Sequence, residues 1–195
     1  MRLPYPVAQT LCAIAEAAAR DIGVPMAIAL ADEEGSLQFF ARMKGALPAS
    51  SEISCSKAFT AASLRMSTDK VGELARSDGV LAGIQNTHGG RIILFGGGFP
   101  LYFDGEVVGA IGISGGSVEQ DMLVAGPVIE AFVEMERWAE HFGSVPTFSL
   151  QDVDRAHNLE KSLAFALEKE GLPVDWRELQ ILVGGVVLAA CGNRL

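Results

Sequence analysis

The residues with the most chemical potential gather in a glycine-rich stretch in the second half of the chain. Residues 96–121 read "GGGFPLYFDGEVVGAIGISGGSVEQD". Glycine at this density indicates backbone that bends sharply or lies close to another group. Gly115 and Gly116 precede a predicted helix, and helix N-termini attract anions. No Gly-Lys-Ser/Thr follows, and Glu119 and Asp121 already place negative charge in the first turn. These details argue against a nucleotide phosphate.

Gly96, Gly97 and Gly98 form the most suggestive cluster, because three residues without side chains leave room for a flat or bulky ligand. The alternative is that the run only turns the chain before Pro100. We expect it to line a pocket, so that Gly97→Val abolishes ligand binding while the fold survives.

The strand-to-helix corner that follows adds Ser114, Gln120 and Asp121 to the candidate ligand site. Ser117 and Gln120 also have capping-box spacing, which favours a role in capping the helix. Asp121 could instead stabilise the helix start, or pair with a basic residue of another subunit.

Lys57 and His88 are the other two candidates. Lys57 lies on a predicted helix of small residues, where its ammonium could bind a propionate or another carboxylate; a solvated lysine is the alternative. His88, in "NTHGGRIILFGGG", could ligate iron or move protons near neutral pH, or simply bond to a backbone carbonyl. The three cysteines are far apart and show no metal-ligand spacing. His141 and His157, in the outer helix and the tail, are interpreted as surface residues.

Composition limits the classes of partner. The chain has 195 residues, 49% hydrophobic and 20% charged, which suits a globular domain with a sizeable core. Its formal net charge of −9 disfavours nucleic acid and anionic membranes as partners. The N-terminus lacks the pattern of a signal peptide, and no apolar run is long enough to span a bilayer. We expect a cytoplasmic protein.

The pattern of elements predicts an α+β domain with an antiparallel sheet. Helical spacing covers residues 6–22, followed by two strands around a turn at 32–35. Helices follow at 49–66 and 68–79. Three strands are then expected, over 90–97, 99–103 and 106–116, the last two joined by the hairpin signal Asp104-Gly105. A final helix to His141 should break in two at Pro127.

The remaining chain is interpreted as an extension, which divides the sequence into a domain at 1–142 and a linker with helical tail at 143–195. The predicted helix 176–190 is apolar nearly all round, so a surface must bury it. We expect that surface on a neighbouring subunit, with an external partner as the alternative.

Together, the motifs Gly-Gly-Gly-X-Pro, Asp-Gly and "GAIGISGGSVEQD" resemble the GlcG/HbpS family, which includes the C-terminal domain of PduO-type proteins. "SCSKAFTAASLRMST" is similar to its Lys-Ala-X-Thr-Ala helix, with Lys57 and Thr60 in place. The resemblance covers roughly residues 5–140. It implies a profilin-like α-β-α fold and a homo-oligomer. In characterised relatives a histidine near the N-terminal helix serves haem, whereas residues 1–87 here contain none.

Three functional hypotheses follow. The resemblance implies a small-molecule or cofactor-binding protein, with haem or a corrinoid as the ligand and His88 as the protein ligand if haem binds. A second hypothesis is an enzyme acting on a small hydroxy- or oxo-acid, with Lys57 holding the carboxylate and His88 transferring a proton. A third is a structural or microcompartment cargo role through the tail.

Overall fold

The computed structural model describes the backbone of residues 3–142 and the side chains of residues 3–136, together with Lys169. The chain divides into two compact units, residues 1–147 and 148–195. The predicted linker and tail helix, including 176–190, lie outside the described residues.

Helices and strands follow one another in the expected order up to the middle of the chain. The N-terminal helix begins after Pro4, because proline at the helix start costs no hydrogen bond. The long helix α2 likewise has proline in its first turn, and ends at Arg65 in the left-handed conformation. The elements are α1 (Tyr5–Asp21), β1 (Ala27–Asp32), β2 (Leu37–Arg42), α2 (Pro48–Leu64), α3 (Thr68–Leu74), η1 (Ile84–Asn86), η2 (His88–Gly90), β3 (Gly98–Phe103), β4 (Glu106–Ser114) and α4 (Val118–Phe142).

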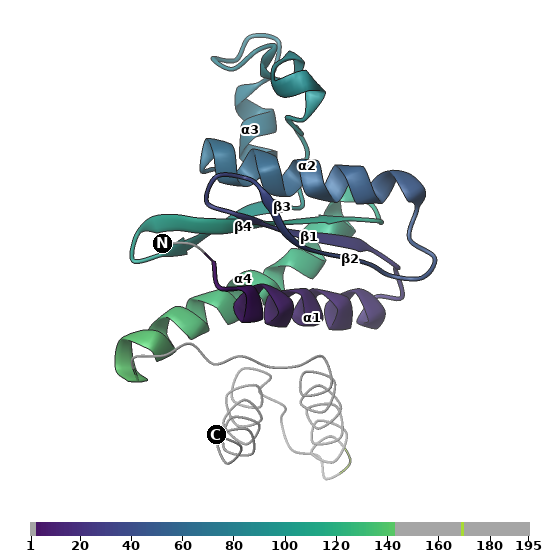
Figure 1. Cartoon of the computed structure of the whole chain (residues 1–195). Helices are drawn as coiled ribbons and strands as arrows, with labels where there is room; N and C mark the ends of the chain where they lie inside the picture. The colour runs from purple at the N-terminus through teal and green to yellow at the C-terminus, as the bar shows by residue number, and fades with distance from the viewer. Residues whose placement is uncertain (1–2, 143–168, 170–195) are drawn as a thin grey trace. The chain divides into compact units, whose positions relative to one another are not determined.

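The four strands form one antiparallel sheet in the order β2-β1-β4-β3. Helices α1 and α4 cover one face and α2 covers the other (Figure 1). The expected α+β architecture with α-β-α layers is therefore confirmed. Within the described residues, no helix is long and apolar enough to cross a membrane.

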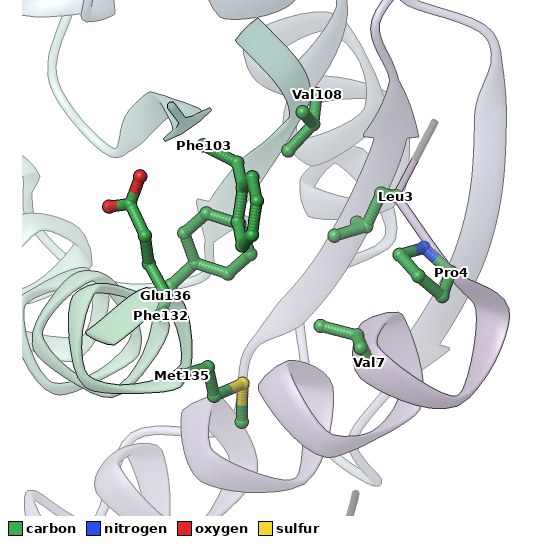
Figure 2. Close-up of a pocket in the computed structure, with 8 residues that line it drawn as sticks. All are labelled: Leu3, Pro4, Val7, Phe103, Val108, Phe132, Met135 and Glu136. Atoms are coloured by element: carbon green, nitrogen blue, oxygen red, sulfur yellow. The ribbon is translucent and has the colours of Figure 1, made fainter. Parts of the chain in front are cut away.

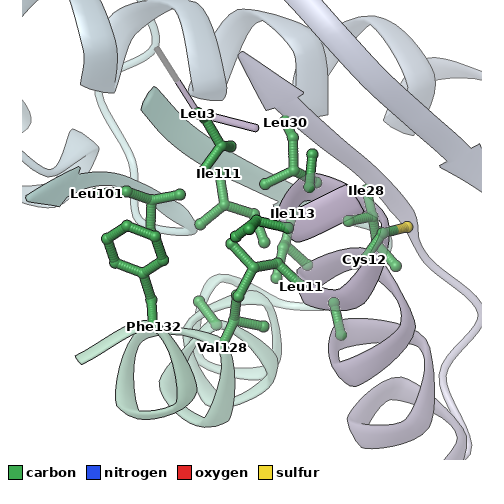
Figure 3. Close-up of a cluster of buried hydrophobic side chains, with 14 of the residues drawn as sticks. Leu3, Leu11, Cys12, Ile28, Leu30, Leu101, Ile111, Ile113, Val128 and Phe132 are labelled. Atoms are coloured by element: carbon green, nitrogen blue, oxygen red, sulfur yellow. The ribbon is translucent and has the colours of Figure 1, made fainter. Parts of the chain in front are cut away.

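The two faces of the sheet are packed very differently. Alternate residues of β1 and β4 send large aliphatic side chains toward α1 and α4, where they meet Leu11, Val128 and Phe132 (Figure 3). The other face carries alanines, which pack with the alanines of α2. The large side chains from the strands are Ile28, Leu30, Ile111 and Ile113.

Gly112 in β4 explains how closely α2 approaches the sheet. A Cβ atom at this position would lie 2.0 Å from the carbonyl oxygen of Ser54 and 2.5 Å from the backbone nitrogen of Ala58. The close approach of backbone to another group, one expectation for this glycine-rich stretch, is confirmed at Gly112. The contact fixes α2 so that its central residues lie directly against the strands.

Two sequence predictions were wrong. Residues 90–97 do not form a strand, and β3 begins only at Gly98. The Thr60 hydroxyl of α2 instead hydrogen-bonds to the carbonyl oxygen of Arg91 and the amide of Ile93. Helix α4 is continuous through Pro127 rather than broken into two. Proline removes one amide donor, and the exposed position of Pro127 leaves the ring free of the packed core.

Candidate functional site

Lys57 is an unusual residue, because a lysine is rarely buried completely. Its side chain is 0% exposed. The Nζ atom donates to Asp121 Oδ2 at 2.6 Å and to the carbonyl oxygen of Ile113 at 2.8 Å. The pair joins α2 to the end of β4 and the beginning of α4.

The electrostatics of this pair follow from its burial. Removal from water lowers the pKa of Lys57, and the Asp121 carboxylate opposes that shift. The ring of Phe95 lies over the ammonium, 5.0 Å from Nζ, and adds a cation–π contact. Asp121 is 3% exposed, and its other oxygen accepts the amide hydrogen of Gly116 at 3.0 Å. Each partner thus has additional polar contacts, as a buried ion pair requires.

The glycine run 96–98 is packed against this pair. Because Gly97 has no side chain, Lys57 Nζ can lie close to it: the nitrogen would be only 2.7 Å from a Cβ atom at this position. Gly96 makes room for Met122, and Gly98 for Thr68 and the carbonyl of Lys57. The room expected for a ligand is therefore occupied by the protein's own atoms. Gly97 also has φ +109°, so Gly97→Val would disturb the fold and not only ligand binding.

The strand-to-helix corner has the predicted cap. Gln120 Oε1 accepts the amide hydrogen of Ser117 at 2.9 Å, and Ser117 Oγ accepts that of Gln120 at 3.3 Å. This reciprocal capping box confirms the capping interpretation of Ser117 and Gln120. Ser114, at the end of β4, is buried beside them and pairs in register with Ala27 of β1.

His88 belongs to a separate, exposed cluster. It lies in the short helix η2 with φ +53°, and its ring centroid is 5.7 Å from that of Phe59 on α2. The guanidinium of Arg91 lies over the same ring, 3.9 Å from its centroid. Gly89 and Gly90 follow with positive φ, and among the described residues no atom beyond the chain neighbours would lie within 4 Å of a Cβ atom on either. The backbone beside the imidazole is therefore open.

The hydrogen bonds of Thr87 decide which ring nitrogen carries the hydrogen when the His88 imidazole is neutral. Thr87 Oγ1 lies 2.6 Å from the carbonyl oxygen of Ile84 and 2.9 Å from His88 Nδ1. A carbonyl cannot donate, so the single hydroxyl hydrogen goes to Ile84. Nδ1 must then carry the hydrogen that it donates to Thr87, which leaves the lone pair on Nε2. An imidazole held this way is arranged as a metal ligand.

The structure thus brings together Lys57, Asp121 and the glycine run, and keeps His88 apart from them. Among the described residues, no contact joins His88 to Lys57. The oxo-acid hypothesis gave Lys57 a substrate carboxylate to bind, but Asp121 already holds that position. No group of three His, Cys, Asp or Glu side chains within residues 3–136 could hold a metal ion.

Sequence reasoning missed Phe59, Arg91, Phe95 and the structural importance of Thr60. Phe59 and Thr60 lie inside the Lys-Ala-X-Thr-Ala motif, and Arg91 follows His88 by three residues. Their closeness in sequence to Lys57 and His88 was the signal that could have indicated the cluster around Phe59. Phe95 had none, because its relation to Lys57 depends on how the 91–98 segment crosses α2.

A small apolar cavity lies between the sheet and helices α1 and α4 (Figure 2). Its volume is about 30 Å³, and side chains of α1, β3, β4 and α4 line it. Glu136 is the one charged residue of its lining, and Oε1 of that side chain accepts the amide hydrogen of Asp104 at 2.6 Å. The cavity has about the size of one water molecule, which is typical of a packing defect rather than of a ligand site.

Known proteins with similar sequences and structures share this fold. The family model for the haem-degrading HbpS-like proteins matches residues 3–130. A 15.0 kDa protein of Citrobacter freundii, encoded between dhaT and dhaS, is 38% identical over 128 residues, which are 66% of this chain and 90% of that protein. The solved PduOC:heme complex is 34% identical with a TM-score of 0.65, covering 67% of this chain and 94% of that one.

A relative of known activity matches only in part. The corrinoid adenosyltransferase PduO of Salmonella typhimurium is 37% identical over 113 residues, which are 58% of this chain and 34% of that protein. The matched part is thus about a third of the adenosyltransferase. Because the family model matches residues 3–130, more than half of the chain, the chain belongs to the HbpS-like family of haem-degrading proteins.

Proposed function

We propose that the chain is a haem-binding protein and that His88 Nε2 is the iron ligand. The observation that carries the proposal is the hydrogen-bonded order Ile84–Thr87–His88, which leaves the Nε2 lone pair for a metal. Iron in a tetrapyrrole takes a neutral imidazole of this kind as an axial ligand. When bound, the haem would supply the redox or oxygen chemistry.

Two neighbours of His88 suit the rest of the macrocycle. The half-buried ring of Phe59 offers an apolar surface, and the Arg91 guanidinium beside it matches the geometry of a propionate. The open backbone at Gly89 and Gly90 places no side chain against an approaching flat ligand. The relative of solved structure that carries haem supports the same ligand class.

A corrinoid is the second candidate, because cobalt also takes an imidazole ligand and because PduO is a relative. The ring side chains of cobalamin are amides rather than carboxylates, so Arg91 would find no carboxylate at the edge of the macrocycle. We therefore expect haem to bind more tightly than cobalamin.

Haemin titration followed at the Soret band tests the proposal. His88→Ala should remove the shifted Soret band of the ligated form, whereas His141→Ala, a control that removes another histidine of the chain, should leave it. Thr87→Val, which no longer fixes the tautomer, should weaken binding. If His88→Ala titrates like the wild type, haem is not ligated by His88 and the proposal falls.

Arg91 can be tested separately with a modified ligand. Arg91→Gln should weaken binding of haemin but not of haemin dimethyl ester, whose propionates carry no charge. Equal losses for both ligands would mean that Arg91 does not contact a propionate. Titration with aquacobalamin in parallel compares the second candidate directly.

We also infer that the protein forms a homo-oligomer, in the cytoplasm or in association with a microcompartment. Support comes from the exposed apolar side chains of Phe95 and Leu123, 41% and 61% exposed, and from the apolar sequence 176–190. Truncation after Gly143 should lower the oligomeric state in size-exclusion chromatography with light scattering. An unchanged, well-behaved oligomer would show that the tail does not hold subunits together.

A further inference from the structure

The segment that follows His88 is held to α2 by one buried hydroxyl. Thr60 is 0% exposed, and its Oγ1 accepts the amide hydrogen of Ile93 at 3.0 Å. The same oxygen lies 2.7 Å from the carbonyl oxygen of Ser56 and 3.2 Å from that of Arg91. A single side chain therefore serves both a donor and an acceptor of residues 91–93, which belong to no strand.

The hydroxyl cannot be replaced by an apolar group of the same shape. Its one hydrogen is shared between the carbonyls of Ser56 and Arg91, and its lone pair receives the Ile93 amide. Thr60→Val would keep the volume but leave that amide without its partner, and such a group would seek water. Thr60→Ser would keep all three contacts and remove only a methyl group.

The position of Thr60 connects this anchor to the His88 cluster. Phe59 is the residue before Thr60 on α2, and its ring receives both the Arg91 guanidinium and the His88 imidazole. One turn of helix thus presents the ring and also fixes the backbone of the residue whose guanidinium lies over it. Release of the backbone at 91–93 would free Arg91 and the preceding loop from the ring.

A matched anchor exists at the other end of the segment. Thr68 is also 0% exposed, and its Oγ1 accepts the amide hydrogen of Gly98 at 3.0 Å. Like Thr60 it accepts an amide hydrogen through a buried hydroxyl, but the backbone that it holds is the beginning of β3 rather than residues 91–93. The two threonines differ in what lies next to the backbone that they hold.

We propose that Thr60 is a positioning residue for the haem site, because its hydroxyl holds the Arg91–Ile93 backbone across α2 and so keeps Arg91 and His88 on Phe59. This inference rests on the proposed function. It adds a residue that touches neither iron nor macrocycle, and it assigns the threonine of the Lys-Ala-X-Thr-Ala motif a role in ligand binding.

The first measurement uses the haem-free full chain and does not depend on the ligand. Amide hydrogen exchange of the peptide covering residues 87–93 should be at least about tenfold faster in Thr60→Val than in the wild type. Thr60→Ser and Thr68→Val should exchange there like the wild type. Unchanged exchange in Thr60→Val would overturn the proposal, because the anchor would not hold the segment.

The second measurement is haemin titration of the same variants. Thr60→Val should bind about tenfold more weakly, a loss of roughly 1.4 kcal/mol, with less of the shifted Soret band. Thr60→Ser should stay within about twofold of the wild type, as should Thr68→Val even if its thermal stability falls. Equal weakening by Thr60→Val and Thr68→Val would indicate a general loss of stability and overturn the positioning role.

The two proposals can fail separately. If His88→Ala leaves the Soret band unchanged, the proposed ligation fails, and the positioning role fails with it even where exchange shows that Thr60 anchors the segment. If His88→Ala removes the band but Thr60→Val binds haemin like the wild type, haem binding stands and the role of Thr60 is refuted.

Discussion

Removing one partner of the Lys57–Asp121 pair should cost far more than removing both. The side chains are 0% and 4% exposed, so Lys57→Met would leave a carboxylate in the interior with the Gly116 amide as its remaining described partner. Loss of one partner of a buried pair costs about 3–5 kcal/mol. Asp121→Asn should be similar, since it leaves a buried ammonium without its counter-ion.

The double variant Lys57→Met/Asp121→Asn carries neither charge and should recover part of that loss. Methionine fills the volume of the lysine stem, and asparagine can still accept from Gly116. We expect the two substitutions to be non-additive by about 2–3 kcal/mol. At a denaturant slope of about 2 kcal/mol/M, each single variant would move the urea midpoint down by about 1.5–2.5 M.

Urea unfolding followed by far-UV circular dichroism measures all four proteins at one concentration. An unchanged slope would show that the variants unfold the same structure. Single losses below about 1 kcal/mol would mean that the pair behaves like a surface ion pair. Strict additivity would mean that the 2.6 Å contact contributes no coupling, and either result would refute the reasoning.

Three further predictions concern packing and ionisation. Gly112→Ala should destabilise the protein by more than about 3 kcal/mol, because the backbone of α2 cannot yield to the new methyl group. Gly105→Ala, whose methyl group would meet no described atom within 4 Å, should cost about 1 kcal/mol for its positive φ. Thermal melts compare the two variants. Burial and the charge of Glu16 raise the pKa of the Cys12 thiol to about 12, so in a background lacking the other cysteines the native protein should not react with Ellman's reagent at pH 8, whereas the unfolded chain should. The pKa of Lys57 is lowered from 10.5, so the unfolded chain binds more protons than the native protein in the window just below pH 10.5. The free energy of unfolding of the wild type should therefore rise with pH in that window relative to Lys57→Met, as measured by urea titrations. A difference that does not change with pH would contradict the shift.

Local patterns in the sequence were sufficient for the features that depend on neighbouring residues. The Asp104-Gly105 hairpin and the Ser117–Gln120 cap appear as predicted because turn and cap chemistry is decided within a few positions. The expected strand at 90–97 failed because a side chain from a distant helix offered its backbone better partners. That competition is not visible in a run of β-branched residues.

The candidate site was only partly predictable for the same reason. Lys57 and Asp121 were both singled out, but they are 64 positions apart and nothing local joins them. Their contact depends on the distance between α2 and the sheet, which the alanines and Gly112 decide together. His88 was recognised by its type alone, whereas its tautomer depends on the hydroxyl of Thr87, whose other partner is the carbonyl oxygen of Ile84.

The unequal packing of the two sheet faces has a consequence for how this chain can change over time. Between the sheet and α1 with α4, large aliphatic side chains can exchange volume with one another, so many combinations fill the same space. Between the sheet and α2 the contacts are made largely by alanine, serine and glycine, which have little volume to give up when a neighbour becomes larger. Random mutagenesis should therefore yield functional variants mostly on the first side, while the second admits almost none. The helix that carries Lys57, Phe59 and Thr60 would then be the part of the molecule least free to drift, for reasons of space before any reason of chemistry.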